Sequence, residues 1–145
     1  MQQLKKLRVN LKNSEKKMNR RIYDTRFLVE AIYSENSEFQ RKAEAEKKNR
    51  EKYVSVVALH ELYRLTLSRE GRETAKLRIS LLKQTFKVVP VDEKVAELSA
   101  ELRQKYQLSM GDSMIAATAS ILNAVCISDD PHFHQIKEIK TSWIN

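Results

Sequence analysis

The 145 residues include 27 Lys and Arg against 19 Asp and Glu, two Gly, two Pro and one Cys, and the formal net charge is +8. A chain of this length forms one domain with its own core, and two glycines exclude collagen-like and Gly-rich nucleotide-binding sequences. A single cysteine, Cys126, supplies neither an internal disulfide nor a multi-thiolate zinc site, which favours a reducing, cytoplasmic setting.

The positive charge is concentrated at the N-terminus. Residues 1–21 hold eight Lys or Arg against Glu15 alone, whereas the other 124 residues hold 19 basic and 18 acidic side chains. We therefore predict a basic leader over residues 1–17 and a domain over 18–145. The leader is either native sequence or an addition, and it forms either a disordered, solvated tail or an arm that binds nucleic acid. No stretch is long and apolar enough for a signal peptide or a membrane span, so we expect no membrane partner.

Short apolar runs alternate with helical periodicity along the rest of the chain. The alternation predicts a three-layer α/β/α domain, in which helices cover both faces of a parallel sheet of about five strands. Ligands in such folds bind at the carboxyl ends of the strands. Strands are predicted at 22–23, 53–57, 86–91, 124–128 and 139–141, and helices at 25–34, 37–50, 58–70, 72–85, 92–106 and 111–122.

Four acids lie near these carboxyl ends. Asp24 ends the first strand and Glu61 follows the second by four residues; Asp112 begins the helix before the fourth strand and Asp130 follows that strand. If the strands are neighbours, the four carboxylates converge. Such a cluster is electrostatically unfavourable by itself, and oxygen ligands suit Mg²⁺ or Mn²⁺. The sequence thus predicts a site for a divalent cation.

Each acid also has a structural interpretation. Asp24 and Asp130 can cap helices, Asp112 can interact with a helix dipole, and Glu61 can be a surface acid. Against this, Asp112 precedes a nearly charge-free helix and Glu61 lies among apolar residues. Neither has a nearby basic residue in sequence that obviously neutralises it.

Four sequence blocks carry a family resemblance. The runs YDTRFLV (23–29), SVVALHEL (55–62), GDSMIAATA (111–119) and ISDDPHF (127–133) resemble, in order and spacing, the motif blocks of PIN-domain nucleases. The resemblance covers about residues 20–143 and is closest to the VapC-type toxins of toxin-antitoxin pairs.

The resemblance implies a metal-dependent endoribonuclease that hydrolyses RNA phosphodiester bonds and is held by an antitoxin protein. One or two Mg²⁺ or Mn²⁺ ions would activate water and orient the phosphate. The catalytic and metal-binding residues would be Asp24, Glu61, Asp112 and Asp130, with Thr25 and Ser128 supporting them.

Two positions depart from the family pattern or leave it ambiguous. Arg26 stands where many members carry a small polar residue, and the leader has no counterpart. Asp129 and Asp130 are adjacent, and the spacing to Phe133 favours Asp130 as the ligand.

Single-stranded or looped RNA is the expected substrate, because its backbone bends into a carboxylate cleft and the nearly neutral body offers little to a long duplex. Zinc at His132 and His134 is a weaker hypothesis, as is a response-regulator receiver, and the main rival is a non-catalytic protein that binds an antitoxin or RNA. Excess apolar residues on the early helices predict a homodimer or a groove for an antitoxin helix: Phe27, Val29, Ile32 and Tyr33.

Overall fold

All five strands of the sheet are parallel, and the strand order is β3-β2-β1-β4-β5. The computed structural model describes residues 1–48 and 50–144, apart from the side chains of 14–18. The central strand β1 pairs with β2 on one side and with β4 on the other. The strands are β1 (Arg20–Tyr23), β2 (Glu51–Ser55), β3 (Lys87–Val89), β4 (Val125–Ile127) and β5 (Lys140–Ser142).

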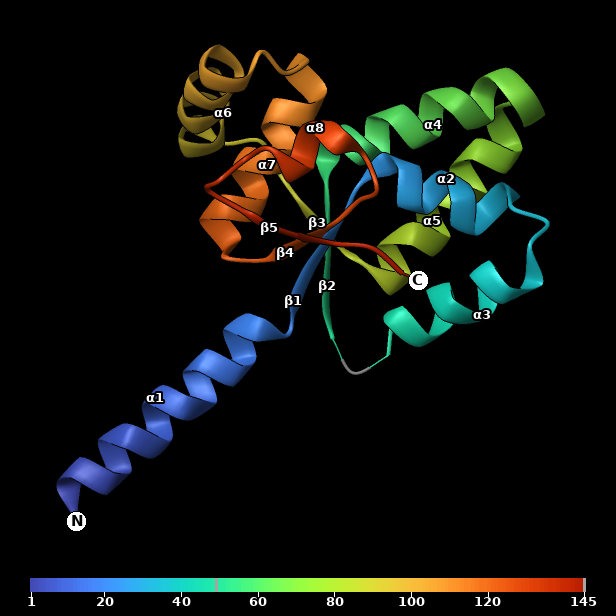
Figure 1. Ribbon diagram of the computed structural model, residues 1–145. Coiled ribbons are helices and arrows are strands. Elements are labelled where there is room, and N and C mark those ends of the chain that lie inside the picture. The colour runs from blue at the N-terminus through green and yellow to red at the C-terminus, as the bar shows by residue number, and fades with distance from the viewer. Residues whose placement is uncertain (49, 145) are drawn as a thin grey trace.

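Helices cover both faces of this sheet, as Figure 1 shows, which confirms the predicted three-layer α/β/α fold. On one side α6 packs against α7, and on the other α4 packs against α2 and α5. The bounds are α2 (Thr25–Tyr33), α3 (Ser37–Glu46), α4 (Val56–Glu70), α5 (Arg72–Thr85), α6 (Glu93–Tyr106), α7 (Met110–Leu122) and α8 (Pro131–His134).

The order of the strands determines where a site can form. The chain builds β1, β2 and β3 in one direction and then returns to place β4 on the other side of β1. This reversal leaves a crevice at the carboxyl ends of β1 and β4, where ligands of open α/β sheets bind. Ile22 pairs with Cys126 in register and both are fully buried, so these strands sit rigidly in the core.

Several element ends differ from the sequence prediction. The second strand ends at Ser55 rather than at residue 57, because the Ser55 hydroxyl accepts a hydrogen bond from Val57 N at 3.1 Å and starts α4 there. The predicted helix over 37–50 ends at Glu46, and the third strand spans only Lys87–Val89.

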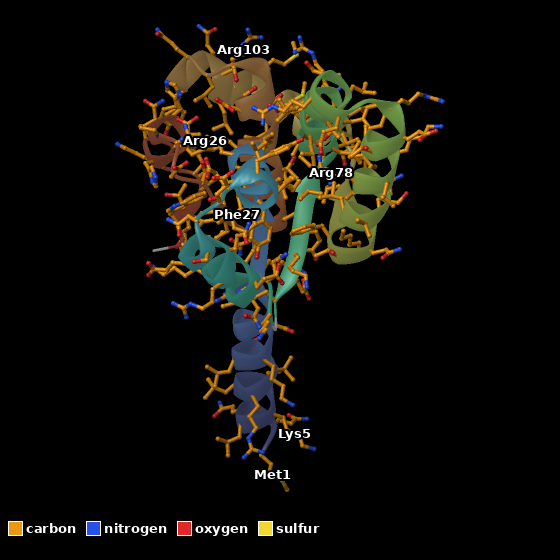
Figure 2. All side chains as sticks on the ribbon, turned by 90° about the vertical axis from the view of Figure 1, so that its right-hand side faces the viewer. Met1, Lys5, Arg26, Phe27, Arg78 and Arg103 are labelled. Carbon is orange, nitrogen blue, oxygen red and sulfur yellow. The ribbon has the colours of Figure 1, made fainter. Side chains whose placement is uncertain are left out.

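A further helix, α1 (Gln2–Met18), occupies the basic leader, where no element was predicted. It projects away from the body of the fold in both Figure 1 and Figure 2, where Met1 and Lys5 mark its free end. Leu4, Leu7 and Leu11 are exposed on it. None of the described helices has the length and apolar character to cross a bilayer.

Candidate active site

Asp24 and Ser128 tie together the ends of the two central strands. Asp24 directly follows β1 and Ser128 directly follows β4, and the backbone N–H of Asp24 donates to Ile127 O at 3.2 Å. The Ser128 hydroxyl donates to Asp24 Oδ2 at 2.7 Å. Asp24 occupies the N-cap position of α2, but its side chain makes no capping hydrogen bond. The Asp24 side chain therefore does not cap α2.

The four predicted acids line a single open pocket of about 350 Å³. Asp24 comes from the end of β1, Glu61 from the second turn of α4, Asp112 from the first turn of α7, and Asp130 from the turn after β4. Asp24 is buried, Asp112 and Asp130 are partly buried, and Glu61 is exposed at the rim. The pocket is lined by Asp24, Thr25, Arg26, Val29, Glu30, Glu61, Asp112 and Asp130.

Burial and mutual repulsion raise the pKa values of three of these carboxyl groups. Burial raises the pKa of Asp24 to about 6, opposed by the hydrogen bond from Ser128 and assisted by the charges of Asp112 and Asp130. Glu61 is exposed as a whole residue, but partial burial of its carboxyl group still raises its pKa, with the charge of Asp112 as the next cause. The pKa of Asp112 is raised by burial and then by Asp130. The acids therefore act on one another as a cluster.

Two hydroxyl groups, of Ser128 and Thr25, lie against the acids. Ser128 Oγ also accepts a hydrogen bond from the backbone N–H of Asp130 at 3.1 Å, so one hydroxyl positions two of the acids. The Thr25 hydroxyl lies beside Glu61 and acts to lower its pKa, yet it forms no hydrogen bond of full geometry within the described residues. Its oxygen is buried beside Glu61.

The two adjacent acids after β4 face different ways. Asp129 forms an ion pair with Arg26, whose Nε lies 3.0 Å from Asp129 Oδ1, and both side chains are exposed. Asp130 lines the acid pocket, and its Oδ1 also accepts from His132 N at 2.9 Å as the cap of α8. Asp130 thus combines the capping role with a place in the cluster.

The sequence prediction did not include His132 among the site residues. Its Nδ1 lies 3.1 Å from Asp130 Oδ1, and atoms of Asp112, Asp130 and His132 lie within 4.8 Å of one another, as in a metal-binding group. The sequence analysis placed His132, two residues after Asp130, only in the weaker zinc hypothesis with His134.

Gly111 allows α7 to approach α4 at the acids. A Cβ at this position would lie 3.3 Å from Glu61 Oε1 and 3.6 Å from Val57 Cγ1. A side chain here would press on the carboxylate of Glu61. Gly111 is therefore part of what positions that acid.

The donor set fits a hard divalent cation. All four central donors are carboxylate oxygens, which Mg²⁺ and Mn²⁺ prefer. Arg26 is the one basic residue that lines the acid pocket in the described part of the chain, and Asp129 already pairs with it. The buried Thr25 oxygen adds a further oxygen donor next to Glu61.

Comparisons with known proteins support this architecture. The family model of the PIN domain matches residues 21–139. The chain belongs to the PIN domain family. The matched segment begins at β1, just after α1, and runs to the edge of β5.

Solved structures share the PIN fold of this chain at low identity. VapBC2 of Rickettsia felis, bound to a DNA fragment from its promoter, has a TM-score of 0.74 at 18% identity over 86% of this chain and 98% of that one. DNA-bound VapBC of Salmonella typhimurium has a TM-score of 0.74 at 16% identity over 88% and 100%. VapC20 of Mycobacterium tuberculosis, a sarcin-ricin loop cleaving toxin, has a TM-score of 0.65 at 17% identity over 83% and 98%. No curated protein sequence matches the chain significantly.

Proposed function

We propose that this PIN protein is a divalent-metal-dependent endoribonuclease and the toxin of a toxin-antitoxin pair. The observation that carries the proposal is the convergence of the four predicted carboxylates, from four separate segments, in one pocket that Glu30 also lines. Bringing three of these charges together costs stability, since burial and repulsion raise the pKa values of Asp24, Glu61 and Asp112. A purely structural role would not require that cost.

The chemistry is hydrolysis of a phosphodiester bond by in-line attack of water. When bound, Mg²⁺ or Mn²⁺ supplies Lewis-acid chemistry, because it lowers the pKa of water and neutralises charge on the phosphate. The pocket holds no nucleophilic Ser, Cys or Lys among its described lining residues. Asp112 and Asp130, whose carboxylates lie at ligand spacing, would hold the cation, and Asp24 and Glu61 would complete the set from the same pocket.

The supporting residues keep the acids in place for this reaction. Ser128 holds Asp24 by a hydrogen bond to Oδ2. The same hydroxyl fixes the backbone of Asp130. Thr25 presents its oxygen beside Glu61. These contacts restrict the rotamers of the acids, as a site for a small octahedral ion requires.

RNA with an accessible backbone is the substrate class that fits the open acid pocket. Arg26 is the one basic side chain among the described residues that line the acid pocket, so phosphate contacts alone give limited affinity for RNA. VapC20, which shares the fold, is a toxin that cleaves the sarcin-ricin loop. A flexible or looped segment presents its backbone to a shallow site better than a stiff duplex does.

An antitoxin helix is the proposed protein partner. An apolar pocket of about 270 Å³ lies between α2, α4 and α5 and shares no lining residue with the acid pocket. Phe27 is fully buried beneath it and Ile32 is partly buried at its wall. Several solved structures of this fold are VapBC complexes of toxin and antitoxin. The predicted homodimer stays a prediction.

The test is cleavage of single-stranded RNA with Mn²⁺ or Mg²⁺ by the wild type, Asp24→Asn and Asp112→Asn. Either substitution should lower kcat/KM by at least about 100-fold, and the double variant should lose little more, because the residues act as a unit. Chelator should abolish cleavage. Asp92→Asn is the matched control, since it changes a carboxylate that caps α6 and does not line the acid pocket. Undiminished cleavage by Asp24→Asn would refute the assignment.

A further inference from the structure

A second pocket adjoins the acids and is not used by the chemistry described above. It has a volume of about 590 Å³ and lies between α4 and α7. Glu61 and Asp112 line both this pocket and the acid pocket. The two carboxylates therefore form a common wall, and the second pocket lies next to the place where a phosphate would meet the acids.

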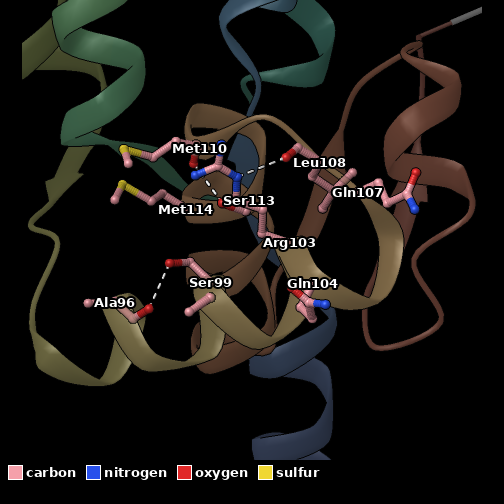
Figure 3. A pocket seen from close by; sticks show the side chains of 10 residues that line it. Ala96, Ser99, Arg103, Gln104, Gln107, Leu108, Met110, Ser113 and Met114 are labelled. Atoms are coloured by element: carbon pink, nitrogen blue, oxygen red, sulfur yellow. Dashed lines mark hydrogen bonds between the residues drawn. The ribbon is translucent and has the colours of Figure 1, made fainter.

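The surface of the second pocket is apolar where it leaves the acids. Val56 is 37% exposed and Met110 is 57% exposed, and Met114 lies beside them in the lining. Figure 3 shows another pocket, between α6 and α7, which shares Met110 and Met114 with the second pocket. The side chains of these two residues extend in the same direction. Exposed thioethers next to carboxylates contribute nothing to binding a cation or a phosphate. They provide a polarizable contact for the face of an aromatic ring.

Arg64 supplies a cation at the far side of the same pocket. It lies one helical turn after Glu61 on α4, and it forms no hydrogen bond or ion pair with any residue that the structure describes. A free guanidinium beside an apolar surface suits a phosphate or the plane of a base. By contrast, the arginine on the other side of the acids, Arg26, is already paired with Asp129.

We propose that the pocket between α4 and α7 binds one nucleobase of the RNA, next to the phosphate held at the acids. The base lies against Met110 and Val56, and Arg64 contacts the phosphate that follows it. The inference rests on the proposed function, since it takes the backbone position from the acids. The volume of the pocket falls within the roughly 300–1,000 Å³ of small-molecule sites. Base stacking here would give the enzyme part of its substrate preference.

The experiment measures binding separately from cleavage. A fluorescent single-stranded RNA of about 10 nucleotides, and a set in which each base in turn is abasic, are titrated by anisotropy against full-length protein carrying Asp24→Asn, with Mn²⁺. At one position the abasic RNA should bind roughly 5- to 100-fold more weakly than the intact RNA. Met110→Ala in this background should weaken binding of the intact RNA about fivefold and leave binding of that abasic RNA unchanged.

Arg64→Gln should reduce the slope of log K against log salt by about 0.7, which is one phosphate contact to a single strand. Leu77→Ala and Arg72→Gln are the controls, because they remove an exposed apolar and an exposed basic side chain from α5, and neither should change binding. Wild-type affinity of Met110→Ala for every RNA, or an equal loss for intact and abasic RNA, would overturn the pocket assignment.

Failure of this inference is distinguishable from failure of the proposed function. Cleavage by the wild type tests the acids, whereas coupling between Met110 and one base tests the pocket. A protein that cleaves RNA without such coupling keeps the function and loses the base site. Absence of both cleavage and RNA binding overturns both, and a pocket that binds protein instead leaves RNA affinity insensitive to Met110→Ala.

Discussion

Asp24→Asn should stabilise the metal-free protein at neutral pH. Burial is the main reason that the pKa of Asp24 is about 6 in the folded protein, against an ordinary value of 3.8. The folded state therefore binds this proton more tightly than the unfolded chain does. The favourable contribution is fully present below pH 3.8 and is lost as pH rises through 6, so ionised Asp24 destabilises the fold at pH 7.

The size of the effect follows from the same shift. A difference of about 2 pKa units corresponds to about 3 kcal/mol above pH 7. Asp24 is 3% exposed, so solvent screens little of this energy. Asn keeps an oxygen that accepts from Ser128 and carries no charge. For a chain of this size, the variant should melt roughly 6–12 °C higher than the wild type in chelator.

Thermal melts in chelator at about pH 7.5 and pH 4.5 test this expectation, since the wild type regains most of the lost stability when Asp24 is protonated. The difference between variant and wild type should shrink to about 1 kcal/mol at the lower pH. Asp92→Asn is the control and should melt like the wild type, because Asn and Asp cap helices about equally well. A variant that melts below the wild type in chelator at pH 7.5, or a difference independent of pH, would refute the reasoning.

Three other outcomes follow from the same geometry. Asp112→Asn should raise the melting temperature in chelator and reduce the stabilisation gained with Mn²⁺, whereas a mere dipole role predicts a loss of about 0.3–1 kcal/mol and an unchanged response to Mn²⁺. Gly111→Ala should leave the melting temperature unchanged or slightly higher, because Ala favours a helix, but should lower kcat by displacing Glu61 Oε1, which steady-state kinetics measures. Deleting residues 1–17 should change RNA affinity and its salt dependence only slightly in anisotropy titrations, since α1 stands away from the acids and its charges are screened. If the slope of log K against log salt falls by the equivalent of several phosphate contacts, α1 binds RNA.

The sheet and the convergence of the acids followed from local pattern. Buried strands such as β1 and β4 read as short apolar runs, and an acid directly after such a run is placed at the carboxyl edge by chain direction alone. Asp24 needed no further information. Glu61 and Asp112 depended on the helical period as well, because each lies within the first two turns of its helix.

Competition between capping and propensity explains where the boundaries moved. Val56 and Val57 have high strand propensity, but the capping hydrogen bond of Ser55 starts α4 at Val56. In the leader, Leu4, Leu7 and Leu11 recur at helical spacing, which is the signal for α1 that the concentration of basic charge concealed.

The sequence did not predict which way the side chains point within a single turn. Asp129 and Asp130 differ by one position, and the ion pair between Asp129 and Arg26 spans 103 residues of chain, so no local period encodes it. The approach of His132 to Asp130 likewise depends on the turn that begins α8. Such placements arise from packing between segments, which spacing along the chain does not specify.

If the acid cluster holds a cation as proposed, metal binding is coupled to proton binding. A carboxyl group with a pKa of about 6 is ionised at pH 7 and protonated at pH 5, so protons and a cation compete for Asp24 in the range where cells regulate pH. Ser128 limits this competition, because its hydrogen bond lowers the pKa of Asp24 against the effect of burial. The Ser128 hydroxyl therefore keeps Asp24 more acidic than burial alone would leave it, and it also accepts from the backbone N–H of Asp130. This double contact gives a buried Ser between two of the four acids a structural reason.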